Sequence, residues 1–225
     1  RAMKATLLLL RLEGVLQSWG IKARWDIRDT ASAPTKSGVI GMIGCALGYR
    51  RDSVELANLF DRLKMAVRIE NPGIITMDYH TVQGNLWTAA GNQRNHTIVS
   101  KRYYLQDASF LVILEGEKSH IESISAAIQN PKWPIYLGRK SCVPTRPVFE
   151  GLTEEYANLE EALRKIPWKW RGAQREPKTT PKTLQCFLED ERCERTRPDH
   201  APMFPSRLYR LRGEKAFRVN LPNEG

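Results

Sequence analysis

Short apolar runs alternate with helical patterns along this chain, and their order limits the possible folds more than any other feature. Lys4–Leu12 is a short, largely apolar run, and Ala108–Leu114 is apolar on both alternating faces. A third short run, Met65–Glu70, ends at a Pro-Gly turn. Runs of this length and composition predict strands, and the two most apolar ones predict strands that are buried on both sides.

Three capping residues precede the helical patterns. Thr35, Ser53 and Ser119 each stand just before apolar residues that recur at helical spacing, so we expect them to be helix N-caps. The first of these helices should run to about Leu47. It contains several glycines, which lower its intrinsic stability but allow close packing against it.

Between these elements, Ile74–Val82 and His96–Leu105 predict two paired strands with the polar segment Gln83–Asn95 as the tip. A last short strand is expected at Ile135–Leu137, just before a glycine. With the hairpin treated as an insertion, the order is βαββαβ. The predicted fold class is therefore α+β, a modified ferredoxin-like fold of the kind found in RNA-recognition (RRM) domains, with a protruding β-hairpin at about residues 76–105.

The last third of the chain has a different pattern. A helix is expected after Gly151, with Tyr156, Leu159, Leu163 and Ile166 on its apolar stripe and Pro167 at its end. A polar, basic and proline-containing linker or loop follows at Trp168–Lys182. Three short strand candidates follow, at Leu184–Leu188, Arg207–Leu211 and Ala216–Leu221. We therefore predict an RNA-recognition-like domain at residues 3–151 and a C-terminal part with a small β subdomain at residues 152–225.

The charge of the chain favours polyanionic partners. It has 35 Lys and Arg against 25 Asp and Glu, a formal net charge of +10. The alternative is an ordinary basic protein without such a partner. No run approaches the roughly 18 apolar residues that a membrane helix needs, so we expect no membrane association.

Cysteine and histidine usage gives little support to a metal site. The four cysteines form no C-x-x-C pair, and there are only four histidines. We therefore expect no metal and no cofactor. Free thiols without a recognisable leader segment predict a cytoplasmic protein.

The segment that follows Ile135–Leu137 is the first candidate for binding chemistry. Gly138 can bring its backbone N–H close to a phosphate, Arg139 can grip a phosphate with its planar fork, and Lys140 supplies a point charge. Ser141 and Cys142 complete this loop. The alternative is an exposed turn whose cations are merely solvated.

Two further motifs are candidates. Lys36, Ser37 and Gly38 stand at a helix start, where free N–H groups and the helix dipole favour anions, although an ordinary capped helix is the alternative. Gln17 and Trp19 lie in the loop after the first strand. They could contact a splayed base, or Trp19 could close the core beneath the loop.

The predicted hairpin carries residue types that can cleave RNA by general acid–base chemistry without metal. The same types can also stack on bases and pair with phosphates, which is the less demanding role. The residues expected to place the hairpin on RNA are His80, Thr81, Val82, Lys101, Arg102 and Tyr103.

Several blocks occur together in one order: LRLEGVLQSWG, PTKSGVIGMIGCALG, MDYHTV, YYLQDASFLVIL and IYLGRKSCVPTRPVFEG. Together they resemble the CasD-like, type I-E branch of the fifth CRISPR-associated family. The resemblance covers about residues 3–151 and continues loosely through RPDHAPMFPSRLYRLR. Residues 152–196 carry little that matches.

The resemblance implies a RAMP-type fold with a protruding thumb hairpin, and a role in capping the 5′ handle of crRNA in the Cascade surveillance complex. It places the 138–142 loop and the helix start at Lys36 against the handle. It implies the neighbouring backbone subunit and the large PAM-recognition subunit as partners, with target DNA reached indirectly. The type I-E branch binds without cleaving, whereas a type I-C branch cleaves precursor RNA with Tyr, Lys and His. A metal-independent endoribonuclease is therefore the main alternative, and a general single-strand RNA binder is a third.

Overall fold

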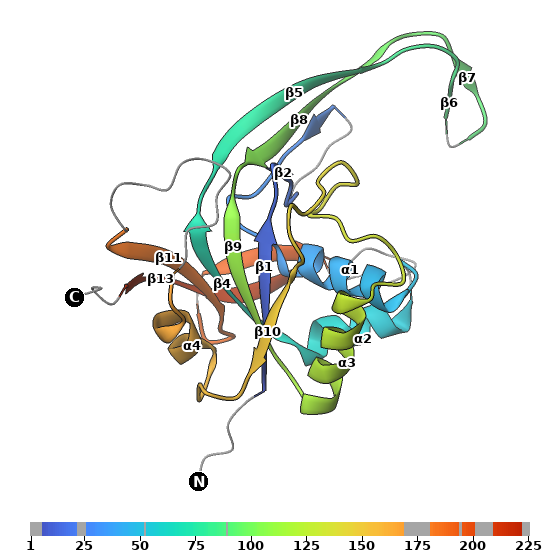
Figure 1. Cartoon of the computed structure of the whole chain (residues 1–225). Helices are drawn as coiled ribbons and strands as arrows, with labels where there is room; N and C mark the ends of the chain where they lie inside the picture. The colour runs from blue at the N-terminus through green and yellow to red at the C-terminus, as the bar shows by residue number, and fades with distance from the viewer. Residues whose placement is uncertain are drawn as a thin grey trace.

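The computed structural model describes residues 6–21, 26–51, 53–88, 90–168, 181–193, 195–200 and 209–221. These residues form a mixed α+β structure with mainly antiparallel sheets and four helices among the described elements. The expectations for residues 22–25, 169–180 and 201–208 lie outside the described residues. Figure 1 shows a central sheet flanked by helices, from which a long hairpin projects.

The main sheet has seven strands in the order β10-β1-β9-β4-β11-β13-β12, and every neighbouring pair is antiparallel. The strands that the sequence predicts at residues 4–12, 65–70 and 108–114 stand next to one another in its middle. The strand bounds are β1 Leu7–Glu13, β4 Lys64–Asn71, β9 Ser109–Glu115, β10 Phe149–Thr153, β11 Thr183–Glu189, β12 Thr196–His200 and β13 Tyr209–Asn220.

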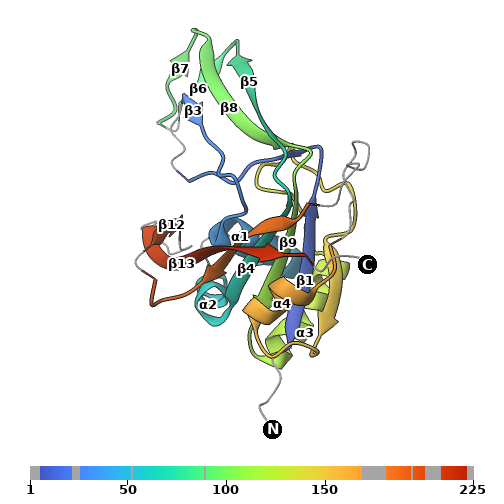
Figure 2. The same ribbon diagram turned by 90° about the vertical axis from the view of Figure 1, so that its left-hand side faces the viewer.

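Both faces of the central strands are buried. Successive residues of these strands are therefore apolar, instead of alternating between apolar and polar. Phe110 and Val112 of β9 join the core under α1 (Lys36–Leu47), α2 (Val54–Arg62) and α3 (Lys118–Gln129). Leu111 and Ile113 join a second core formed with α4 (Leu159–Lys165), β11 and β13. The two views show α1–α3 gathered on one side of the sheet and α4 on the other (Figures 1 and 2).

A buried ionic network fastens α4 to the sheet. The guanidinium of Arg68 is fully buried and donates hydrogen bonds of 2.8 and 2.7 Å to the carbonyls of Leu163 and Ile166 at the end of α4. A cation at this position stabilises the carbonyls that a helix leaves unpaired at its C-terminus. Glu70 balances the charge, because it accepts from Arg68 Nε at 2.6 Å and pairs with Arg11 at 3.2 Å.

The long hairpin consists of β5 (Ile74–Val82) and β8 (Ile98–Gln106), which pair over their full length. Two short strands also pair with β8: β2 (Leu16–Gln17) is antiparallel to it at its base, and β3 (Ile27–Arg28) is parallel to its middle. At the tip, β6 (Leu86–Trp87) pairs with β7 (Gln93–Arg94). The hairpin extends well beyond the body of the molecule (Figure 1).

Two of the three predicted helix caps are confirmed. The Thr35 side chain accepts the Gly38 N–H at 3.2 Å, and Ser53 accepts the Leu56 N–H at 3.3 Å. The third prediction is wrong, because α3 begins earlier and has Glu117 at its N-cap position. Ser119 lies inside the helix and donates to the Glu117 carboxylate at 2.9 Å.

The strand predicted at Ile135–Leu137 is also wrong. These residues form a loop, and the strand that completes the order is β10, which pairs with β1. At the C-terminal end, the described residues 209–211 of one candidate and residues 216–220 of the next belong to one continuous strand, β13, and the sequence pattern missed β12. Because β11 pairs with β4, these strands extend the main sheet.

Candidate functional site

The segment Gly138–Cys142, called the 138–142 loop below, is a tight turn held by its own backbone. The Leu137 N–H donates to the Cys142 carbonyl at 2.7 Å, and the Cys142 N–H donates to the Arg139 carbonyl at 2.8 Å. This closure explains why the apolar run ends at Gly138. It leaves Lys140 and Ser141 exposed at the outside of the turn.

Gly138 is required by the packing of the protein itself. Its φ of +97° is a conformation that other residues rarely adopt. A Cβ at this position would lie 1.7 Å from the carbonyl oxygen of Ser18, whose N–H in turn donates to the Leu137 carbonyl at 3.0 Å. The glycine therefore serves the close approach of the loop to residue 18, whereas the sequence suggested an approach to phosphate.

Arg139 differs most from its expected role. Its guanidinium donates hydrogen bonds to the carbonyls of Tyr103 at 3.1 Å, Arg28 at 2.9 Å and Asp29 at 3.2 Å. It also lies over the ring of Tyr104, with 4.6 Å between the guanidinium carbon and the ring centroid. The fork that was expected to grip a phosphate thus holds the base of the long hairpin.

The remaining side chains of the loop differ in their exposure to solvent. Cys142 is fully buried, so it cannot touch a ligand from this position, and burial raises the pKa of its thiol. Lys140 and Ser141 are exposed and remain available for a polyanion. Only these two side chains keep the role that the sequence predicts for the loop.

Gln17 and Trp19 are core residues, which corrects the expectation that they contact a base. Trp19 is 1% exposed and Gln17 0%. The Gln17 amide donates to the carbonyls of Leu12 and Ala108 at 3.2 and 2.7 Å, so it ties the ends of two central strands to the loop. The alternative in which Trp19 closes the core beneath the loop is the one that the structure supports.

The polar groups at the helix start near Lys36 are likewise bound by other residues of the protein. Lys36 is 2% exposed, and its Nζ lies 2.7 Å from the Glu189 carboxylate and 4.5 Å from the centre of the Phe60 ring. The Gly38 N–H is capped by Thr35. A Cβ on Gly38 would come within 2.9 Å of the Trp19 ring. Lys36 and Gly38 are therefore structural, and Ser37 is half-buried between them.

The six residues predicted on the hairpin do not share one face. Residues that stand opposite each other in an antiparallel pair point to the same side, and alternate residues point to opposite sides. Asp78 is opposite Arg102, and Tyr79 is opposite Lys101. One face therefore carries His80, Val82 and Arg102, and the other carries Thr81, Lys101 and Tyr103.

This division bears on acid–base chemistry. A general acid and a general base must both reach one scissile bond within hydrogen-bonding distance. His80 points to one side of the hairpin, whereas Lys101 and Tyr103 point to the other. The nearest carboxylate oxygen to His80 belongs to Asp78, at 3.6 Å on the same face. These three side chains therefore do not form a common catalytic cluster in this structure.

The structure also assembles an arginine cluster that the sequence reasoning missed. Arg195, Arg197 and Arg212 surround the buried Glu214 carboxylate, with nitrogen–oxygen distances of 3.9, 3.3 and 3.1 Å. They come from segments about fifteen residues apart, paired as β12 and β13, so only strand pairing, which was not predicted, could have revealed them.

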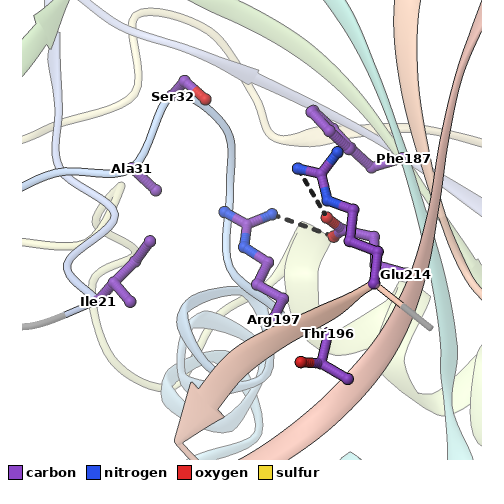
Figure 3. A pocket seen from close by; sticks show the side chains of 8 residues that line it. Ile21, Ala31, Ser32, Phe187, Thr196, Arg197 and Glu214 are labelled. Carbon is purple, nitrogen blue, oxygen red and sulfur yellow. Dashed lines mark hydrogen bonds and ion pairs between the residues drawn. The ribbon is translucent and has the colours of Figure 1, made fainter. Parts of the chain in front are cut away.

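A cavity of about 180 Å³ lies beside this cluster. Figure 3 shows Arg197 and Glu214 on one side of it and Ile21 and Ala31 on the other. Arg197 crosses toward the start of α1 and donates to the Ala33 carbonyl at 2.8 Å. Its contacts join the C-terminal strands to the loop before α1, which is a structural role.

The described residues contain no group of three or more His, Cys, Asp or Glu side chains that could hold a metal ion. No helix among them has both the length and the apolar character needed to cross a membrane.

Known proteins similar to this chain belong to CRISPR systems. The profile of the family described as CRISPR-associated protein (Cas_Cas5) matches residues 7–218. The CRISPR system Cascade subunit CasD of Escherichia coli (strain K12) is 36% identical over 170 residues, which cover 69% of this chain and 75% of that protein.

Solved structures agree in fold. A chain of a CRISPR RNA-guided surveillance complex superposes with a TM-score of 0.77 at 31% identity, covering 96% of this chain and 91% of that chain. A structure described as a Cas protein gives a TM-score of 0.71 at 36% identity and covers 95% of both chains. With a family profile that spans most of its length, the chain belongs to the Cas5 family of CRISPR-associated proteins.

Proposed function

We propose that this protein is a non-catalytic RNA-binding subunit of a type I-E Cascade surveillance complex, in which it binds the 5′ handle of the crRNA. The observation that carries the proposal is the junction between the 138–142 loop and the long hairpin. Both elements present exposed cations, Lys140 and Lys101, and the protein's own contacts fasten them together at the hairpin base. We propose that one RNA strand contacts both elements.

The topology supports a RAMP-type assignment. The strands β10-β1-β9-β4, with α1 and α2 before β4 and α3 before β10, follow the order of a ferredoxin-like fold. In this proposal the long hairpin is the thumb. Residues 3–151 are the RNA-binding unit. Residues 152–225 support it through α4 and through β11, which pairs with β4.

The proposed partners follow from the relatives. The curated relative is a Cascade subunit, and one structural relative comes from an RNA-guided surveillance complex. We propose that the thumb contacts the adjacent backbone subunit and that the large PAM-recognition subunit docks nearby, so that target DNA is reached through the complex. All four cysteines are free thiols, which is consistent with a reducing cytoplasm.

The endoribonuclease of the type I-C kind is the second candidate. The division of His80 from Lys101 and Tyr103 between opposite faces of the hairpin favours binding over cleavage. Binding needs only exposed cations and polar groups, which both elements supply.

One experiment tests binding and cleavage together. Purified protein with EDTA is titrated with repeat RNA that carries the handle, and with the same RNA whose handle is scrambled. We expect tighter binding to the intact handle and full recovery of uncut RNA. Equal affinity for both RNAs contradicts handle recognition, and a discrete product that disappears in His80→Ala or Tyr103→Phe supports the nuclease.

A further inference from the structure

We propose that Arg139 is a positioning residue that fixes the angle of the long hairpin against the body of the protein. It thereby sets the spacing between RNA contacts on the hairpin and those on the 138–142 loop. The second half of this inference rests on the proposed RNA-binding function, whereas the first half concerns the geometry of the protein alone.

The guanidinium joins three segments that are distant in sequence. Its Nη1 donates to the carbonyl of Tyr103 in β8 at 3.1 Å. Its Nη2 donates to the carbonyls of Arg28 in β3 and Asp29 just beyond, at 2.9 and 3.2 Å. A planar fork with fixed donor directions can hold three such carbonyls in one arrangement, which a flexible ammonium cannot.

The surroundings keep this fork in place. Below it, the ring of Tyr104 is 6% exposed and lies 4.6 Å from the guanidinium carbon. At the other end of the loop, Gly138 allows the backbone to approach Ser18, whose hydroxyl also contacts the Tyr103 carbonyl at 3.5 Å. The Tyr103 carbonyl oxygen is thus the point where the loop, the residue after β2 and the hairpin meet.

The other anchors of the hairpin lie on β8, where Tyr104 and Leu105 are buried in the core and the Lys101 N–H donates to the Asp26 carbonyl at 2.7 Å. No residue of β5 is buried, because Ile74–Val82 shows only exposed and intermediate side chains. Besides β5, strand β8 pairs with the two-residue strands β2 and β3. Since a strand rises about 3.4 Å per residue, a tilt of about 10° at the base moves the far end of β5 by roughly 5 Å. That displacement exceeds the tolerance of a hydrogen bond to RNA.

The rival role is direct contact with phosphate, for which the positive charge would matter more than the shape of the side chain. Arg139→Lys separates the two, because it keeps the charge and removes the fork. Arg139→Ala removes both. Lys140→Ala is the matched control, since it deletes a neighbouring exposed cation of the same loop.

The hairpin angle can be measured without RNA. Spin labels at Asn85→Cys in the tip and Glu122→Cys on α3, both exposed positions, report it by electron–electron double resonance. Cys45→Ala and Cys193→Ser remove the partly exposed native thiols. We expect one narrow distance distribution in the parent protein and in Lys140→Ala, and a broadened or shifted distribution in Arg139→Lys and Arg139→Ala.

RNA affinity is then measured on the same four proteins without labels. We expect a several-fold loss in Arg139→Lys despite its retained charge. If Arg139→Ala does not fold, Arg139→Lys alone decides. Unchanged distance distributions in the Arg139 variants overturn the proposal. A changed distribution with unchanged affinity overturns its functional half. If even the parent protein fails to bind handle RNA, the proposed function is wrong. The distance measurement still decides whether Arg139 fixes the angle of the hairpin.

Discussion

The indole Nε1–H of Trp19 donates a hydrogen bond of 3.1 Å to the side-chain oxygen of Gln17, and both side chains are buried. The amide nitrogen of Gln17 in turn donates hydrogen bonds to the carbonyls of Leu12 and Ala108. A polar pair that looked suited to an RNA base is thus fully used inside the protein. Its role is to anchor the loop after β1 onto the core.

Replacing Trp19 should therefore damage stability. We expect Trp19→Ala to lower the free energy of unfolding by about 3–5 kcal/mol, the usual cost of removing a large buried aromatic side chain. Trp87→Ala is the control, because that indole is 70% exposed at the hairpin tip and should change stability by less than about 0.5 kcal/mol. Urea unfolding measures both, and equal stability of the two variants would show that Trp19 does not carry the core.

Two glycines with nearly the same backbone conformation provide a matched test of the 138–142 loop. Gly138 and Gly84 have φ values of +97° and +99°. An added Cβ would collide with the Ser18 carbonyl at Gly138, whereas it would meet nothing within 4 Å at Gly84. We expect Gly138→Ala to lower the melting temperature much more than Gly84→Ala. Equal shifts would mean that conformational strain alone, without the close approach to Ser18, accounts for the effect.

The buried ion pair between Lys36 and Glu189 should be costly to break. Lys36→Ala leaves a largely buried carboxylate without its partner, and such changes lower the free energy of unfolding by about 3–5 kcal/mol. The control is Lys118→Ala, which removes an exposed pair with Glu154 and should change stability far less. If Lys36→Ala unfolds like wild type but weakens RNA binding, the helix start is an anion site after all.

The cysteines should differ in how fast a thiol reagent modifies them. Burial raises the pKa of Cys186 to about 12, so its thiol stays protonated when pH rises past the ordinary value of about 8.5. Stability should therefore fall as pH rises from about 8.5 toward 12, because the unfolded chain can ionise this thiol whereas the folded chain keeps it protonated. At pH of about 9 in native buffer, we expect iodoacetamide to modify Cys45 and Cys193 before Cys186. Mass spectrometry of the labelled peptides measures the order, and early labelling of Cys186 would contradict its burial.

Much of the fold could be predicted because local signals and burial agreed. The apolar run around Leu111 and the caps at Thr35 and Ser53 each report directly on the element they belong to. The last strand of the order could not be predicted in this way. Residues 149–153 pair at the sheet edge with only partly buried side chains, so β10 has no continuous apolar pattern.

The candidate site was harder to predict, because a sequence shows which groups are present and not which acceptors they meet. Arg139 was predicted to grip a phosphate, but its guanidinium donates to the carbonyls of residues 28, 29 and 103. Lys36 likewise meets a carboxylate at residue 189. Both cations bind groups of the protein that are distant from them in sequence. Lys140 and Lys101 remain exposed because nothing in the described structure packs over them.

The salt dependence of handle binding tests the central claim most directly. We would measure the affinity of the wild-type protein and of the Lys101→Ala/Lys140→Ala variant for handle RNA over a range of salt concentrations. Each phosphate neutralised in a single strand contributes a slope of about −0.7 to log K against log salt. We predict that the variant binds more weakly and that its slope is shallower by about 1.4, as expected for two lost phosphate contacts. A variant with the affinity and slope of wild type would contradict the assignment of the 138–142 loop and the long hairpin to RNA binding.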